Sequence, residues 1–71
     1  LFDDDTGALV GVGVNSVRRL GNSVLHAEIV AIMAAQRSLG TYALGQVAGR
    51  RFMLASSCDP CAMCLGAVLW S

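Results

Sequence analysis

Two short clusters of potential metal ligands constrain this 71-residue chain more than any other feature. The first is His26–Glu28 and the second is Pro60–Cys64, which contains a C-x-x-C pair. Imidazole and thiolate are ligands that zinc prefers, and three protein ligands with an open fourth position are typical of catalytic rather than structural zinc. The sequence therefore predicts a Zn²⁺ site formed by His26, Cys61 and Cys64, which the fold must bring together.

Both clusters fall near predicted helix starts. Apolar residues recur at helical spacing after Ser23, a possible N-cap, and before Gly40, a possible stop, which predicts a helix over Val24–Leu39. Asp59-Pro60 is a favourable N-cap followed by a favourable first helical residue, which predicts a helix from Pro60 to at least Trp70. Unpaired N–H groups and the helix dipole favour thiolate at such positions. We therefore expect the zinc between two helix N-termini.

Glu28 has a different predicted role from His26. Two residues on an ideal helix are about 200° apart, so the two side chains could not share a metal from a helix interior. At the N-terminal end, a group beyond the helix tip can face both. Zinc lowers the pKa of bound water to about 7, and a nearby carboxylate can then carry the proton. Glu28 is accordingly predicted to be the catalytic acid/base and not a ligand.

The N-terminal part of the chain predicts a hairpin. Asp3–Gly7 has turn chemistry, and Leu1-Phe2 is expected to end a preceding strand. Ala8–Asn15 alternates valine with Gly11 and Gly13, which predicts a strand whose glycine face allows a neighbour to pack closely.

The remaining segments complete an α/β pattern. Thr41–Arg50 reads as a loop, and Arg51–Ala55 is short and apolar enough for a strand buried on both faces. The predicted order is β-β-α-β-α, which implies a layered α/β domain. A domain this small usually needs a metal, a partner or more chain to hold it, so we read the chain as a fragment.

Charge and cysteine content narrow the function classes. Five acidic residues balance five arginines, and no basic patch for nucleic acid is visible. Three cysteines at metal-ligand spacing favour a reducing compartment, so a cytoplasmic location is expected. No apolar run approaches the roughly 20 residues of a membrane span, and we expect no membrane partner.

Together the clusters resemble the H-x-E and P-C-x-x-C signature of the zinc-dependent cytidine and deoxycytidylate deaminase superfamily. The resemblance runs from the hairpin through Trp70. It implies a three-layer α/β/α cytidine-deaminase-like fold, of which residues 1–71 would be a single partial domain lacking an N-terminal helix and C-terminal strand-helix units. It also implies a homodimer.

Within the superfamily, Ser57–Trp70 is most similar to the S-C-E-P-C-P-M-C-L-G-A-x-x-W run of bacterial guanine deaminases. Trp70 favours that branch over the tRNA enzymes, and Asn15 matches an asparagine that binds substrate in the family. The resemblance implies conversion of guanine to xanthine and ammonia, in purine metabolism. The chain departs from that family pattern at two places: Asp59 replaces the usual Glu, and Asn22–Leu25 replaces the usual D-P-T-A before the histidine. A tRNA adenosine or a deoxycytidylate-type substrate therefore stays as an alternative.

A reading of another class concerns Cys58, which extends the pattern to C-x-x-C-x-x-C. A fourth thiolate would suit a structural zinc or an iron–sulfur cluster, and the chain would then be a non-catalytic, zinc-stabilised module. The occupant of the fourth zinc position distinguishes the two classes: water beside Glu28 indicates an enzyme, whereas Cys58 indicates a structural site.

Overall fold

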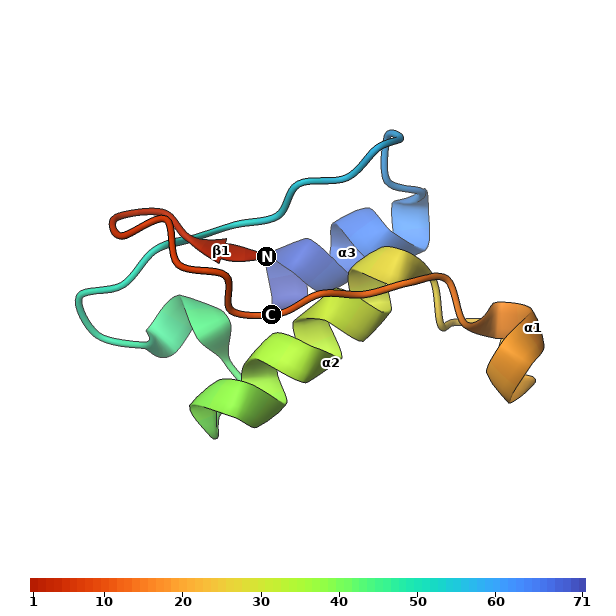
Figure 1. Ribbon diagram of the computed structural model, residues 1–71, viewed down its shortest axis with the longest axis horizontal. Helices are drawn as coiled ribbons and strands as arrows, with labels where there is room; N and C mark the ends of the chain where they lie inside the picture. The colour runs from red at the N-terminus through yellow and green to blue at the C-terminus, as the bar shows by residue number, and fades with distance from the viewer.

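Two helices, α2 (Ala27–Leu39) and α3 (Ala62–Trp70), lie side by side and begin at the same end of the molecule (Figure 1). The computed structural model describes residues 1–71. The other elements are short, and in chain order they are β1 (Phe2–Asp3), α1 (Val17–Leu20), the 3₁₀ helix η1 (Leu44–Gln46) and β2 (Phe52–Met53). The α/β class is therefore confirmed, with the helices packed beside a small sheet.

The sheet has two antiparallel strands, with Phe2 opposite Met53 and Asp3 opposite Phe52. On the other edge of β1, the chain turns back and pairs with the strand. The N–H of Asp3 donates to the carbonyl of Ala8 at 2.8 Å, and Phe2 forms an antiparallel bridge with Leu9. The hairpin predicted for the first residues is thereby confirmed.

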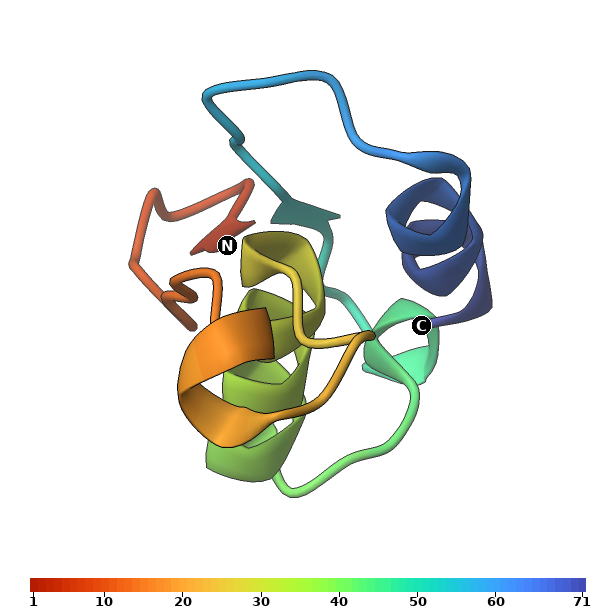
Figure 2. The same cartoon turned by 90° about the vertical axis from the view of Figure 1, so that its right-hand side faces the viewer.

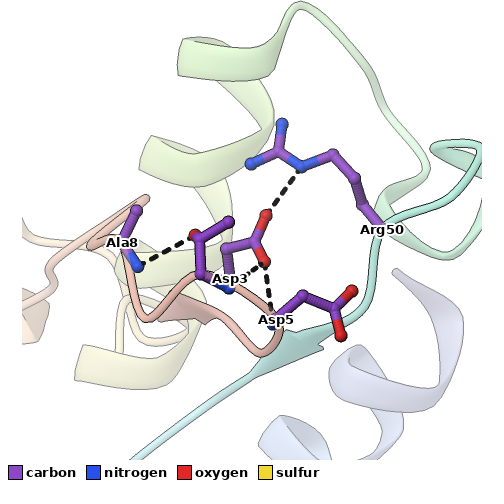
Figure 3. A network of polar contacts seen from close by, with 5 residues as sticks. Asp3, Asp5, Ala8 and Arg50 are labelled. Atoms are coloured by element: carbon purple, nitrogen blue, oxygen red, sulfur yellow. Dashed lines mark hydrogen bonds and ion pairs between the residues drawn. The ribbon is translucent and has the colours of Figure 1, made fainter.

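Asp3 organises the hairpin turn (Figure 3). It is only 3% exposed, and its Oδ1 accepts the N–H groups of Asp5 at 2.9 Å and Thr6 at 3.1 Å. Its Oδ2 pairs with Nε of Arg50 at 2.9 Å, and the Arg50 guanidinium lies over the ring of Phe52. The hydrogen bond from Arg50, with those from the turn, holds the pKa of Asp3 below its ordinary value. This ion pair ties the turn to the segment that enters β2.

The predicted strand Ala8–Asn15 is wrong as a paired strand. After the bridge at Leu9 the segment has no strand partner, and the N–H groups of Val12, Gly13 and Val14 make no backbone hydrogen bond. A strand is defined by its neighbour, and beyond Gly11, which is hydrogen-bonded to Leu1, no other segment of the chain pairs with this one.

The predicted close approach of the glycine face is confirmed. A Cβ on Gly11 would lie 2.6 Å from the carbonyl oxygen of Ala31, and one on Gly13 would collide with the carbonyl oxygen of Ala27. The backbone of this segment therefore rests directly on α2, in a direction opposite to that helix, as the red-to-orange trace over α2 shows (Figure 1).

Both long helices begin later than the sequence predicted. The N-cap of α2 is His26 rather than Ser23, because a turn closes first: the N–H of Leu25 donates to the carbonyl of Asn22. The N-cap of α3 is Cys61 rather than Asp59. The predicted end of α2 is confirmed, since Gly40 adopts a left-handed φ of 66° as its C-cap.

Three further features differ from the prediction. The loop Thr41–Arg50 contains η1, and α1 was not predicted at all. The segment Arg51–Ala55 is paired only at Phe52–Met53, and it is not buried on both faces because Met53 is half exposed. The buried core is small, and it lies between α2, η1 and the start of the chain: Leu1, Ile32, Ala35 and Leu44.

The longest helix, α2, has 13 residues. None of the helices has the length and the apolar composition that crossing a membrane requires. The outer face of α3 is nevertheless strongly apolar, and Leu69 and Trp70 are largely exposed on it.

Candidate metal centre

The structure brings His26, Cys61 and Cys64 together. Nδ1 of His26 lies 3.5 Å from Sγ of Cys61 and 3.6 Å from Sγ of Cys64. Zinc bonds of about 2.3 Å to sulfur and 2.0–2.1 Å to nitrogen, at the tetrahedral angle, place two ligand atoms about 3.6 Å apart. The measured separations therefore fit one tetrahedral zinc ion without rearrangement of the histidine relative to either thiol.

The helix starts explain why these side chains converge. His26 and Cys61 are N-caps with extended backbones, at ψ 159° and ψ 171°, so neither belongs to the helical spiral. Because α2 and α3 lie side by side and begin at the same end, their N-cap residues are neighbours; Figure 2 views the molecule from that end, with α1 in front. Cys64 follows in the first turn of α3. The sequence predicted His26 as the third and Cys61 as the second residue of their helices, three and two positions beyond the N-cap positions that they occupy.

The two thiols differ in acidity. The backbone N–H and the thiol of Cys64 stabilise the Cys61 thiolate, and they hold the pKa of Cys61 below its ordinary value. Burial raises the pKa of Cys64 to about 11, and the neighbouring Cys61 and Glu28 add to that rise. In the metal-free protein Cys61 thus ionises first, and metal binding at Cys64 must displace a proton.

Glu28 lies beside this cluster, in the first turn of α2. Its negative charge raises the pKa of both Cys61 and Cys64, which places the carboxylate near the two sulfur atoms. Glu28 also lines a cleft of about 350 Å³ whose walls include Gly13 and Ser56-Ser57. Glu28 therefore borders both the ligand cluster and this cleft.

Asn15 lies just before α1 and is exposed. Its Oδ1 accepts the N–H of Val17 at 3.1 Å. The next residue, Ser16, donates its N–H to the carbonyl of Leu25 at 2.9 Å. Since Asn15 precedes Ser16 and His26 follows Leu25, this one backbone hydrogen bond makes the predicted substrate residue and the predicted ligand close neighbours.

Cys58 is left out of the cluster. It is an exposed free cysteine, and the group of ligand atoms that could hold a metal contains only His26, Cys61 and Cys64. The structure thus provides three ligands for one ion and does not bring a fourth thiol to it.

Sequence reasoning missed Ser16. It is completely buried, and its hydroxyl is hydrogen-bonded on both sides, to Val14 and to Arg19. The sequence did contain a signal for the short helix α1 that Ser16 begins. Typical cap residues stand at both of its ends, Asn15-Ser16 before Val17 and Gly21 after Leu20.

Comparison with known proteins agrees with this geometry. Residues 2–71 match the family model described as the cytidine and deoxycytidylate deaminase zinc-binding region. The chain is 40% identical over 65 residues to a guanine deaminase of Bacillus subtilis (strain 168), which is 92% of this chain and 38% of that protein. It is also 40% identical over 63 residues to a tRNA(Ile)-lysidine synthase of Deinococcus radiodurans, which is 89% of this chain and 10% of that protein. No solved structure matches it.

The chain therefore spans less than two fifths of the length of either relative. Its two-stranded antiparallel sheet and helices are consistent with a fragment of the cytidine deaminase fold. The match to a zinc-binding region and the spacing of the three ligand atoms both fit Zn²⁺ as the cofactor. Because the family model covers nearly every residue, the chain belongs to the zinc-binding cytidine and deoxycytidylate deaminase family.

Proposed function

We propose that the protein containing this chain is a zinc-dependent hydrolase that deaminates guanine to xanthine and ammonia. Membership of the family supports hydrolytic deamination in general. The observation that carries the proposal is the three-ligand cluster with a carboxylate beside it, because such a site leaves one metal position for water. Guanine as the substrate is supported by the 40% identity to a guanine deaminase over 92% of this chain.

The proposed roles follow from position. His26, Cys61 and Cys64 would hold zinc, which when bound supplies Lewis-acid activation of a water molecule. Glu28 would take one proton from the water that attacks the ring carbon bearing the amino group, and would pass it to the adjacent ring nitrogen. It would then take the second proton, from the hydroxyl now on that carbon, and pass it to the departing amine, so that one guanine and one water give one xanthine and one ammonia.

Asn15 would orient the ring. Its amide is exposed, and it is tied to the segment carrying His26 through the hydrogen bond between Ser16 and Leu25. A substrate held by Asn15 would present its reacting carbon on the side of the metal, which lowers the entropic part of the barrier.

Wider proposals concern the whole protein. We propose that residues 1–71 are part of one deaminase domain, that the protein is a homodimer and that it works in the cytoplasm. The largely exposed Leu69 and Trp70 on α3 support an apolar contact with further chain or a second subunit, and the unpaired cysteines suit a reducing compartment. The mass of the full-length protein in solution tests the dimer.

A direct assay tests the substrate. The full-length zinc-loaded protein is incubated separately with guanine, deoxycytidylate and a tRNA with adenosine in its anticodon loop, and ammonia release is measured. We expect release from guanine alone. Release only from tRNA or deoxycytidylate would keep the deaminase mechanism and reject guanine. Tight zinc binding with no release from any of these substrates would favour a non-catalytic module.

A further inference from the structure

We propose that Ser16 is a positioning residue that holds the side chain of Asn15 in one orientation beside the metal centre. This inference rests on the proposed function and adds to it the residue that fixes Asn15.

The side chain of Ser16 closes a small ring around Asn15. Its Oγ donates to the carbonyl oxygen of Val14 at 3.0 Å, so the residues on either side of Asn15 are bonded to each other. Ser16 is 0% exposed, so its hydroxyl is shielded from solvent. The backbone of Asn15 is consequently fixed by its two neighbours.

Arg19 sets the direction of the Ser16 hydrogen bond. Its Nη2 donates to Oγ of Ser16 at 2.7 Å, and a guanidinium can only donate. Since Oγ accepts from Arg19, its single proton is available for the carbonyl of Val14. A charged donor also makes this the stronger type of hydrogen bond.

The backbone of Ser16 anchors the same ring to the metal centre and to α1. Its N–H donates to the carbonyl of Leu25 at 2.9 Å, next to His26, and its carbonyl accepts the N–H of Leu20 at 2.9 Å. Ser16 therefore takes part in four hydrogen bonds that fix the position of Asn15 relative to His26.

The side chain of Asn15 is fixed as well. Its Oδ1 accepts the N–H of Val17, and this assigns the oxygen end of the amide. Its Nδ2 makes no hydrogen bond in the structure and belongs to an exposed residue. Two N–H donors are thus offered outward, whereas the oxygen is already used.

Kinetics of the full-length zinc enzyme test the proposal. Ser16→Ala is expected to raise KM about tenfold, the effect of one hydrogen bond, with kcat within a factor of two. Asn15→Ala is expected to raise KM at least as much, and the double variant no more than Asn15→Ala alone, because both changes remove the same interaction. Ser16→Thr keeps the hydroxyl and should restore KM. Ser23→Ala, an exposed serine without a side-chain hydrogen bond, is the matched control and should leave KM unchanged.

Multiplication of the two KM effects in the double variant would overturn the proposal, as would a fall in kcat with KM unchanged. Arg19→Met, at an exposed position, keeps the Ser16 hydroxyl and removes only the hydrogen bond that it accepts from the guanidinium, and it should raise KM by a few-fold.

A second readout needs no activity and therefore separates this inference from the proposed function. In the substrate-free protein, NMR couplings across χ1 of Asn15 should report one rotamer, and in Ser16→Ala they should report an average over rotamers. Averaged couplings already present in the unsubstituted protein would overturn the proposal. One rotamer in a protein that deaminates no substrate would instead reject only the proposed function.

Discussion

Sγ of Cys61 lies 3.5 Å from Nδ1 of His26, although the two residues are 35 positions apart in the chain. The distance equals the spacing of two ligands on one tetrahedral zinc ion, about 3.6 Å. The two residues are neighbours because they are the N-caps of two helices that begin side by side.

Loss of a ligand thiol should remove the metal, whereas loss of the nearby Cys58 should not. Substitution of residues that only hydrogen-bond to metal ligands already reduces metal affinity by about 10–100-fold. Loss of a ligand itself, in Cys61→Ala, is therefore expected to reduce zinc affinity by more than about 100-fold. Cys58→Ala serves as the matched control, because that thiol lies outside the ligand group. Competition with a chromogenic chelator measures both affinities. Equal losses in the two variants would contradict a three-ligand site.

Replacing Glu28 should separate catalysis from metal binding. Glu28→Gln keeps the size of the side chain but cannot take a proton, and kcat is expected to fall by about 10²–10⁴-fold. Zinc content should stay at one ion per chain, because Glu28 is not in the ligand group. Ammonia release and metal analysis on the same preparation check both statements. Full turnover by the variant would reject Glu28 as the proton carrier.

Zinc binding should strengthen as the pH rises. The ligand form of each cysteine is the thiolate, and burial raises the pKa of Cys64 to about 11, so at neutral pH its proton must leave when the metal binds. Each released proton makes the affinity about tenfold tighter per pH unit. Affinities measured between pH 7 and 9 should therefore rise by at least tenfold per unit. A flat profile would mean that both thiols are already ionised.

Gly13→Ala should destabilise the fold. The added Cβ would collide with the carbonyl oxygen of Ala27, and only movement of the backbone can relieve that contact. Overpacking of this kind costs about 1–3 kcal/mol, measured by denaturant unfolding. Gly66→Ala is the matched control, because a Cβ at Gly66 in α3 meets nothing and alanine favours a helix by about 0.5–1 kcal/mol. Destabilisation by both substitutions would contradict the specific contact.

Asp3→Asn should make stability less dependent on acid pH. The pKa of Asp3 is lowered from 3.8 by Arg50 and the turn N–H groups, so its carboxylate stabilises the folded state above that value. The contribution is lost as the pH falls through the lowered pKa. Melting temperatures from pH 2 to 7 should show a lower stability of the variant at neutral pH and a smaller difference from the unsubstituted protein at pH 2. A constant difference would exclude the ion pair as its cause.

The metal ligands could be predicted from the sequence because local chemistry determines them. The two thiols of the C-x-x-C pair and the imidazole of H-x-E are the kinds of ligand that zinc prefers, and the structure brings these three residues together. The exact helix starts could not be predicted, because Ser23 and Asp59 are good N-caps by residue type alone. Which of several candidate caps is used depends on turns such as the one closed by Asn22 and Leu25.

The strand over residues 8–15 was mispredicted for a different reason. Alternation of valine and glycine predicts which side of the segment packs closely, and Gly11 and Gly13 do contact α2. Alternation does not supply a hydrogen-bonding neighbour, and between Gly11 and Asn15 no backbone N–H of the segment has a backbone partner. The cap residues around Ser16 were visible in the sequence, but its burial was not, since its backbone partner Leu25 depends on how α1 sits against the segment before His26.

The contact of Gly11 and Gly13 with α2 also fixes how this segment is aligned along the helix. The two glycines lie about one helical turn apart on that helix, over Ala31 and Ala27, and only these positions lack a Cβ. A shift of the segment by one residue would press Val12 against the helix, so the alignment has a single solution. Asn15 follows two residues after Gly13, and His26 immediately precedes the first turn of the same helix. The absence of a Cβ at these two glycines thus fixes where Asn15 lies relative to the N-terminal end of α2, which begins after His26.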